Sequence, residues 1–128
     1  MKQGAVMKIK SEMRHFMRRT LSICSAGMLF AASAYADSVN DMCKKADEVC
    51  ACAASQLKKD IGNDSYELYE AVGAAYIAKQ SKGMKMGDAW DAAVKTEANK
   101  RGTGFTQILS QTNAIGKTHR NAIKGCAG

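Results

Sequence analysis

The spacing of four cysteines restricts the fold of this chain more than any other feature. Cys43, Cys50 and Cys52 lie within ten positions of one another, and Cys126 lies near the C-terminal end. In an unbroken helix, Cys43 and Cys50 would be roughly 10 Å apart along the axis, whereas a disulfide requires Cα atoms roughly 4.4–6.8 Å apart. Cys50 and Cys52 would point about 200° apart around the helix and could not bond to each other. The spacing therefore predicts that residues 37–46 fold back instead of extending the helix that follows.

The front of the chain has the three parts of a secretory signal. Arg18 and Arg19 form a charged end, residues 21–32 form an apolar run, and residues 34–36 read Ala-Tyr-Ala, a small-x-small cleavage site. A bilayer span needs roughly 20 helical residues, so the run is too short to remain as an anchor. We expect a signal peptide over residues 1–36, with Met17 as an alternative start. Export would leave a single mature domain, residues 37–128, with no stable membrane anchor.

The net charge of the mature segment differs from that of the whole chain. The whole chain carries a net charge of +7, but residues 1–36 hold six basic residues and one acidic residue. The mature segment keeps thirteen basic and eleven acidic residues, a net charge of only +2. Nucleic-acid binding typically requires a strongly basic surface, so we expect no nucleic-acid partner.

The mature segment contains no proline and no apolar alternation of period two, which predicts an all-α domain. Few large aliphatic residues and abundant alanine indicate helices that pack closely through small side chains. Such a core buries little apolar area, so cross-links contribute much of the stability. We expect a small antiparallel bundle of about four helices stapled by two disulfides. The expected ranges are 47–61, 64–80, 87–101 and 103–124.

Local signals mark the ends of these helices. Gly62, Gly83 and Gly102 are expected to end the first three, because glycine adopts positive φ readily. Asp64 to Glu67 reads Asp-Ser-Tyr-Glu, the pattern of a capping box that opens the second helix.

An even number of cysteines remains once the leader is removed, and in an exported chain this predicts two disulfides. Cys50 falls on the apolar stripe of the first expected helix. In an antiparallel bundle the end of the last helix lies beside the start of the first, which would bring Cys126 near Cys50. We therefore expect Cys50–Cys126 with Cys43–Cys52. The alternative pairing is Cys43–Cys50 with Cys52–Cys126.

The Cys-Ala-Cys pair has two other interpretations. Paired thiolates bind soft metals such as Cu(I) or Zn, but a zinc site normally takes four ligands and no second Cys/His pair is near in sequence. A redox centre of the thioredoxin type would need Cys-x-x-Cys beside a βαβ pattern, and neither is present. Two structural disulfides remain the favoured interpretation.

Three residues could ligate a metal. His119 is the one histidine of the mature segment and lies on the apolar stripe of the last expected helix, so we interpret it as a packed histidine with a hydrogen-bond partner. The alternative is a haem or copper ligand. Met84 and Met86 carry thioether sulfur, which binds copper, although the simpler interpretation is that Met86 packs on Trp90.

Tyrosines follow one side of the second expected helix, at Tyr66, Tyr69 and Tyr76. We interpret them as core residues. The alternative is an exposed aromatic patch for a partner, because tyrosine is enriched at interfaces.

The sequence shows no recognisable catalytic arrangement of nucleophile, base and carboxylate. We therefore expect a non-enzymatic exported protein, periplasmic or extracellular, without a cofactor. It would act by protein–protein interaction, as an inhibitor, immunity protein, adaptor or chaperone, and a second copy of itself is one candidate partner. A periplasmic carrier of copper or haem is the alternative function, and a small cell-wall hydrolase is a third.

Overall fold

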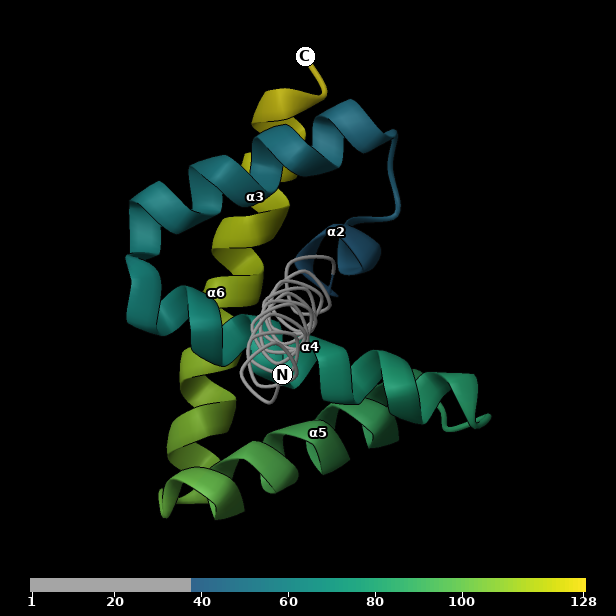
Figure 1. Ribbon diagram of the computed structural model, residues 1–128, viewed down its shortest axis with the longest axis vertical. Helices are drawn as coiled ribbons and strands as arrows, with labels where there is room; N and C mark the ends of the chain where they lie inside the picture. Colours follow the sequence, from purple (N-terminus) through teal and green to yellow (C-terminus); the bar gives the residue numbers. More distant parts are fainter. Residues whose placement is uncertain (1–37) are drawn as a thin grey trace, which may run out of the picture. The chain divides into compact units, whose positions relative to one another are not determined.

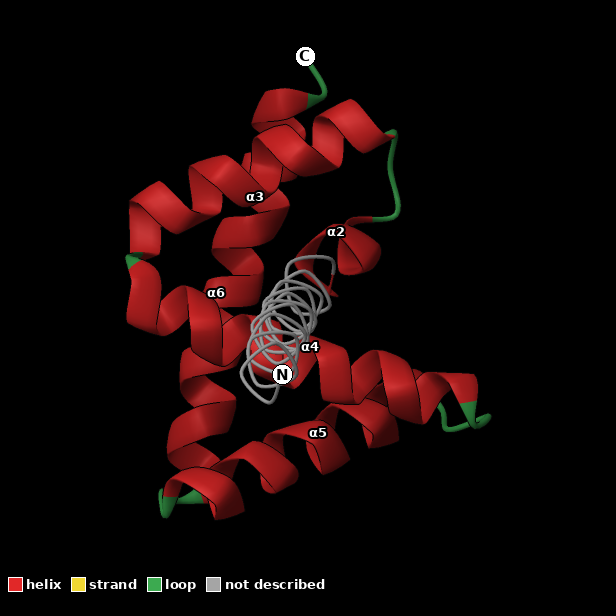
Figure 2. Ribbon diagram, in the orientation of Figure 1, coloured by secondary structure: helices red, strands yellow, loops and turns green. Residues whose placement is uncertain are grey.

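The computed structural model describes residues 38–128, and these form five helices without any strand (Figures 1 and 2). The all-α prediction is therefore confirmed for the part of the chain that is described. The expected signal peptide, residues 1–36, lies outside the described residues. The helices are α2 (Ser38–Cys43), α3 (Asp47–Ile61), α4 (Asn63–Ser81), α5 (Met86–Arg101) and α6 (Phe105–Cys126).

The predicted helix ends are largely confirmed. α3 ends at Ile61, where Gly62 has φ 79°, and α5 ends at Arg101, where Gly102 has φ 62°. Both glycines have positive φ, which residues with a Cβ rarely adopt. The capping box is wrong: α4 begins at Asn63 directly after Gly62, and no side chain caps it. The single glycine between α3 and α4 leaves no room for the expected cap.

The segment before α3 folds back, as the cysteine spacing predicts, although it contains a short helix that was not expected. Lys44 has φ 52°, the one non-glycine residue of the described chain with positive φ, and it turns the backbone between α2 and α3. α2 is held against α4 by the Ser38 hydroxyl, which donates to the Glu70 carbonyl oxygen at 2.9 Å. Val39 beside it is completely buried.

Two disulfides are present, but the pairing that we expected first is wrong. The bridges are Cys43–Cys50 and Cys52–Cys126, with Cα–Cα distances of 5.6 Å and 6.0 Å. Cys50 lies on the buried face of α3, where the returning α2 places the buried Cys43. Cys52, two positions later, is exposed on another side of the helix, and the end of α6 reaches it there. Cys50 was therefore assigned to the wrong neighbour.

The long helix α6 crosses the others instead of running alongside them. Figure 1 shows α3, α4 and α5 following one another in a zigzag, with α6 passing across all three. α6 packs against each of these helices, and α4 packs mainly against α5. The architecture differs in this respect from the simple antiparallel bundle that was expected.

The core consists of two clusters. The first joins α4, α5 and the start of α6, and three of its eight buried residues are alanines, as expected for closely packed helices. The second joins α2, α3, α4 and the middle of α6. Met42 and Trp90 pack against both clusters. The first cluster comprises Leu68, Val72, Tyr76, Ala89, Ala93, Val94, Ala98 and Ile108. The second comprises Val39, Leu57, Tyr66, Tyr69 and Ile115.

None of the helices between Ser38 and Gly128 is both long enough and apolar enough to cross a membrane.

Candidate functional site

A cleft of about 460 Å³ opens where the two clusters meet, and it has mainly apolar walls. We call it the aromatic cleft. α4, α5 and α6 supply most of it, and α2 adds one methionine. Its lining residues are Met42, Tyr69, Tyr76, Met86, Gly87, Trp90, Thr112, Asn113, Gly116, His119, Arg120 and Ile123. An apolar cleft with a few polar groups is the usual form of a ligand-binding or partner-binding site.

His119 lies in the wall of the aromatic cleft and is held by Tyr69. Its side chain is almost completely buried, with 3% of its surface exposed. The Tyr69 hydroxyl and His119 Nδ1 are 3.2 Å apart, and the two rings meet edge to face. His119 Nε2 is also buried, yet no described residue offers it a hydrogen-bond partner. A buried polar atom without a partner is rare and costly.

Burial sets the protonation of this pair. It lowers the pKa of His119, so the imidazole is neutral near pH 7. Burial also raises the pKa of Tyr69 to about 12, against a smaller opposing effect of the Arg120 charge. Both side chains are therefore uncharged at neutral pH, and the charge of Arg120 acts on the cleft from its rim.

Trp90 forms the centre of the aromatic wall. Its ring meets Tyr69 and Tyr76 edge to face, at centroid distances of 6.2 Å and 5.5 Å. Its indole Nε1 donates to Asn113 Oδ1 at 3.2 Å. Edge-to-face contacts and this hydrogen bond fix the orientation of the indole, so this wall of the cleft is preformed.

The structure brings together two of the three candidate metal ligands. Met86 and His119 both line the aromatic cleft, whereas Met84 is not among the lining residues. Met86 is 66% exposed. Within residues 38–128, no group of three or more His, Cys, Asp or Glu side chains is arranged to hold a metal ion.

His119 and the three tyrosines are where the sequence predicted them. His119 is a packed histidine with one hydrogen-bond partner, and Tyr66, Tyr69 and Tyr76 are all buried. No sequence pattern indicated that Tyr69 and Tyr76 would also line a cleft.

Sequence reasoning did not single out the other seven lining residues: Met42, Gly87, Thr112, Asn113, Gly116, Arg120 and Ile123. Arg120 follows His119 directly, so the helical stripe that places His119 inward could have placed Arg120 at its edge. Met42 gave no signal, because its position depends on how the segment before α3 folds back.

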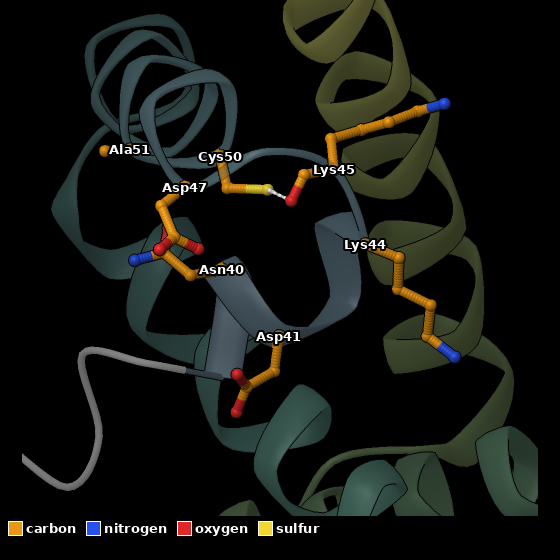
Figure 3. Close-up of a pocket in the computed structure, with 7 residues that line it drawn as sticks. All are labelled: Asn40, Asp41, Lys44, Lys45, Asp47, Cys50 and Ala51. Atoms are coloured by element: carbon orange, nitrogen blue, oxygen red, sulfur yellow. Dashed lines mark hydrogen bonds between the residues drawn. The ribbon is translucent and has the colours of Figure 1, made fainter.

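A second hollow, of about 580 Å³, lies at the junction of α2 and α3 (Figure 3). It is lined by Asn40, Asp41, Lys44, Lys45, Asp47, Cys50 and Ala51. Opposite charges balance in this lining, and it contains no aromatic side chain.

The dashed line in Figure 3 joins Cys50 Sγ to the Lys45 carbonyl oxygen, 3.5 Å apart. Because Cys50 is bonded to Cys43, its sulfur has no proton to donate, and we interpret the contact as packing. Asn40 Oδ1 is buried there without a described partner. The hollow has neither the apolar walls nor the net charge that would select one class of ligand, so the aromatic cleft is the better candidate.

Comparison with known proteins adds no assignment. No protein-family model matches this chain, and no similar protein was found among the curated proteins or the solved structures. What is shown is an all-α fold with two disulfides, and the aromatic cleft is the feature on which a function can be proposed.

Proposed function

We propose that this protein is exported and binds another protein, receiving an apolar side chain of that partner in the aromatic cleft. The partner segment carries a negative group beside that side chain, because Arg120 is the one charged residue among the described residues of the lining. The observation that carries the proposal is the cleft itself, a preformed apolar site beside the exposed Met86.

The residue types in the cleft support a protein partner. Tyrosine, tryptophan, methionine and arginine are the residues enriched at protein interfaces, and Trp, Tyr and Arg dominate their binding energy. The cleft contains all four types. Methionine is flexible and polarisable, so Met86 can adapt to the side chain that it meets.

The two disulfides support export. Disulfides form and persist mainly in oxidising compartments and are rare in the cytosol. Together with the expected signal peptide, they favour a periplasmic or extracellular location.

Met86 and Met84 offer a matched pair for testing the binding site. Both are exposed methionines of one short segment, 66% and 40% exposed, but only Met86 lines the aromatic cleft. A photo-crosslinking residue placed at position 86 should capture one defined protein from the cells that make this chain. The same residue at position 84 should capture it weakly or not at all.

The captured protein, once identified and purified, allows a direct measurement. Met86→Asp should weaken its binding by about tenfold or more, since a negative charge would replace an apolar wall and repel the negative group of the partner. Met84→Asp should bind like the wild type, and circular dichroism would verify that both variants fold. Equal binding of the partner to wild type and Met86→Asp would exclude the aromatic cleft as the binding site. If the captured protein is a second copy of this chain, the chain associates with itself through the aromatic cleft.

A copper or haem carrier remains a second candidate, favoured by the unpartnered Nε2 of His119 in the same cleft as Met86. Histidine nitrogen with methionine sulfur is a ligand set for copper and for haem. Equilibrium dialysis against Cu(I), Cu(II), Zn(II) and haem tests it, with Met86→Ala and His119→Ala as controls. Stoichiometric uptake that both substitutions reduce would support the carrier, and no uptake by the wild type would exclude it.

A further inference from the structure

The free polar groups of the aromatic cleft are mainly hydrogen-bond donors. Asn113 Oδ1 accepts from the Trp90 indole, which leaves the Asn113 amide NH₂ free to donate. The Arg120 guanidinium has only donors. No carboxylate is among the described residues of the lining. The hydroxyl groups belong to buried Tyr69, Tyr76 and Thr112, and the Thr112 hydroxyl already donates to the Ile108 carbonyl oxygen at 2.8 Å.

The N-terminus of α5 adds backbone donors to this set. The first N–H groups of a helix have no partner within the helix, and here Lys85 at the cap position supplies no side-chain bond. Gly87, in that first turn, lines the cleft and is exposed. Helix N-termini attract anions through these N–H groups and through the helix dipole. Asp88, in the same turn, is exposed and is not among the lining residues.

The buried imidazole provides a second, independent observation. If the Tyr69 hydroxyl donates to His119 Nδ1, the neutral ring carries its proton on Nε2, and that N–H is the one group left without a partner. In the other tautomer Nδ1 donates to Tyr69, and both the Tyr69 proton and the Nε2 lone pair lack described partners. The first arrangement leaves fewer groups unpaired. It leaves a buried N–H without an acceptor on a residue that lines the cleft.

We infer that the aromatic cleft recognises the C-terminal carboxylate of its partner, together with the apolar side chain of that last residue. The carboxylate binds between the exposed N-terminus of α5 at Gly87 and the Arg120 guanidinium, and the side chain packs among Trp90, Tyr76 and Met86. His119 Nε2–H is covered in this state, so it makes no direct contact with the carboxylate. This inference rests on the proposed function.

The arrangement of the lining favours a chain terminus over an acidic side chain. The donors and the apolar walls line one small cleft, so the negative group and the apolar group of the ligand must be close together. A C-terminal Leu, Phe or Met carries both on one residue, whereas in Asp or Glu the carboxylate replaces the apolar side chain. Backbone N–H groups with a nearby cation are an established way to hold a terminal carboxylate.

The single tryptophan of the chain provides the assay, because Trp90 lines the cleft and its emission reports an occupied site. The probes are three acetylated peptides: Ala-Ala-Leu with a free carboxylate, the same peptide as its C-terminal amide, and Ala-Asp-Leu amide. We expect the free acid to bind about tenfold more tightly than either amide, the effect of a charge-assisted hydrogen bond. Arg120→Gln should lose most of this preference. Lys117→Gln, which removes the same charge from an exposed position of α6 outside the lining, should keep it.

The outcomes separate this inference from the proposed function. Equal affinities of acid and amide for the wild type would overturn carboxylate recognition and leave an apolar cleft that still binds peptides. Tighter binding of Ala-Asp-Leu amide than of the free acid would assign the negative group to a side chain and overturn the inference. A preference unchanged by Arg120→Gln would also overturn it. The proposed function fails separately, if the captured partner binds Met86→Asp as well as wild type.

Discussion

The two disulfides should differ in their contribution to stability, and the more exposed one should contribute more. Cys52 and Cys126 are 74 positions apart in sequence, whereas Cys43 and Cys50 are only 7 apart. A disulfide lowers the conformational entropy of the unfolded chain, and this effect grows with the logarithm of the number of residues in the closed loop. At 25 °C this gives about 4.4 kcal/mol for Cys52–Cys126 and about 2.4 kcal/mol for Cys43–Cys50. The expected difference in the free energy of unfolding is therefore about 2 kcal/mol.

The loss of packing at a mutated cysteine also changes the stability, and the experiment must separate this effect from the effect of the bridge. Cys43 and Cys50 are buried, and truncating them to alanine would cost stability even without a bridge. Two variants solve the problem: Cys43→Ala/Cys50→Ala keeps only the long bridge, and Cys52→Ala/Cys126→Ala keeps only the short one. Urea unfolding of each variant, oxidised and then reduced, gives the contribution of its remaining bridge, because the truncation is common to both states.

The long bridge should add about 2 kcal/mol more than the short one, which corresponds to roughly 8–16 °C in Tm for a domain of this size. The urea dependence should also be steeper in the reduced proteins, since their unfolded chains are more expanded. An equal or larger contribution from Cys43–Cys50 would refute the loop-length reasoning. The stabilisation would then come from interactions of that bridge within the folded state.

Three further predictions concern other residues. Burial lowers the pKa of His119 below 6.5, so the unfolded chain takes up the proton more readily. The free energy of unfolding should therefore fall as pH drops below about 6.5, by at most about 1.4 kcal/mol per pH unit, and urea titrations of His119→Gln should lack this component. Limited reduction followed by alkylation and mass spectrometry should open Cys52–Cys126 before Cys43–Cys50, because Cys52 is exposed whereas Cys43 and Cys50 are both buried. Simultaneous opening of the two bridges would contradict this. Gly102→Ala should lower the free energy of unfolding by about 1 kcal/mol, because Gly102 has φ 62°. Gly125→Ala, within α6, should raise it by up to about 1 kcal/mol. Thermal unfolding of the two variants measures both changes, and an unchanged stability of Gly102→Ala would show that the turn relaxes.

Helix ends and the inward position of His119 could be predicted because each depends on a local signal. Gly62 and Gly102 end α3 and α5 as expected, because the ability to adopt positive φ depends only on the residue being glycine. His119 shares its face with the apolar residues one turn before and after it. The disulfide pairing could not be predicted in the same way. It depends on the turn at Lys44, a non-glycine residue with φ 52° whose conformation no local pattern announces.

The aromatic cleft could be predicted only in part. Met86 and His119 were candidates from their chemistry, and both line it. Their meeting with Gly87, Asn113 and Arg120 depends on how α6 crosses α5. That crossing is set by side-chain packing between segments far apart in sequence, and periodicity within one helix carries no information about it.

Met42 and Trp90 each pack against both apolar clusters. α3 contributes to one cluster and α5 to the other, so these two side chains, together with α4 and α6, connect the two interiors. Whatever displaces Trp90 must disturb both interiors together. Slow amide protons in α3 and α5 should therefore change their exchange rates in concert when the site is filled, although the two helices belong to different clusters.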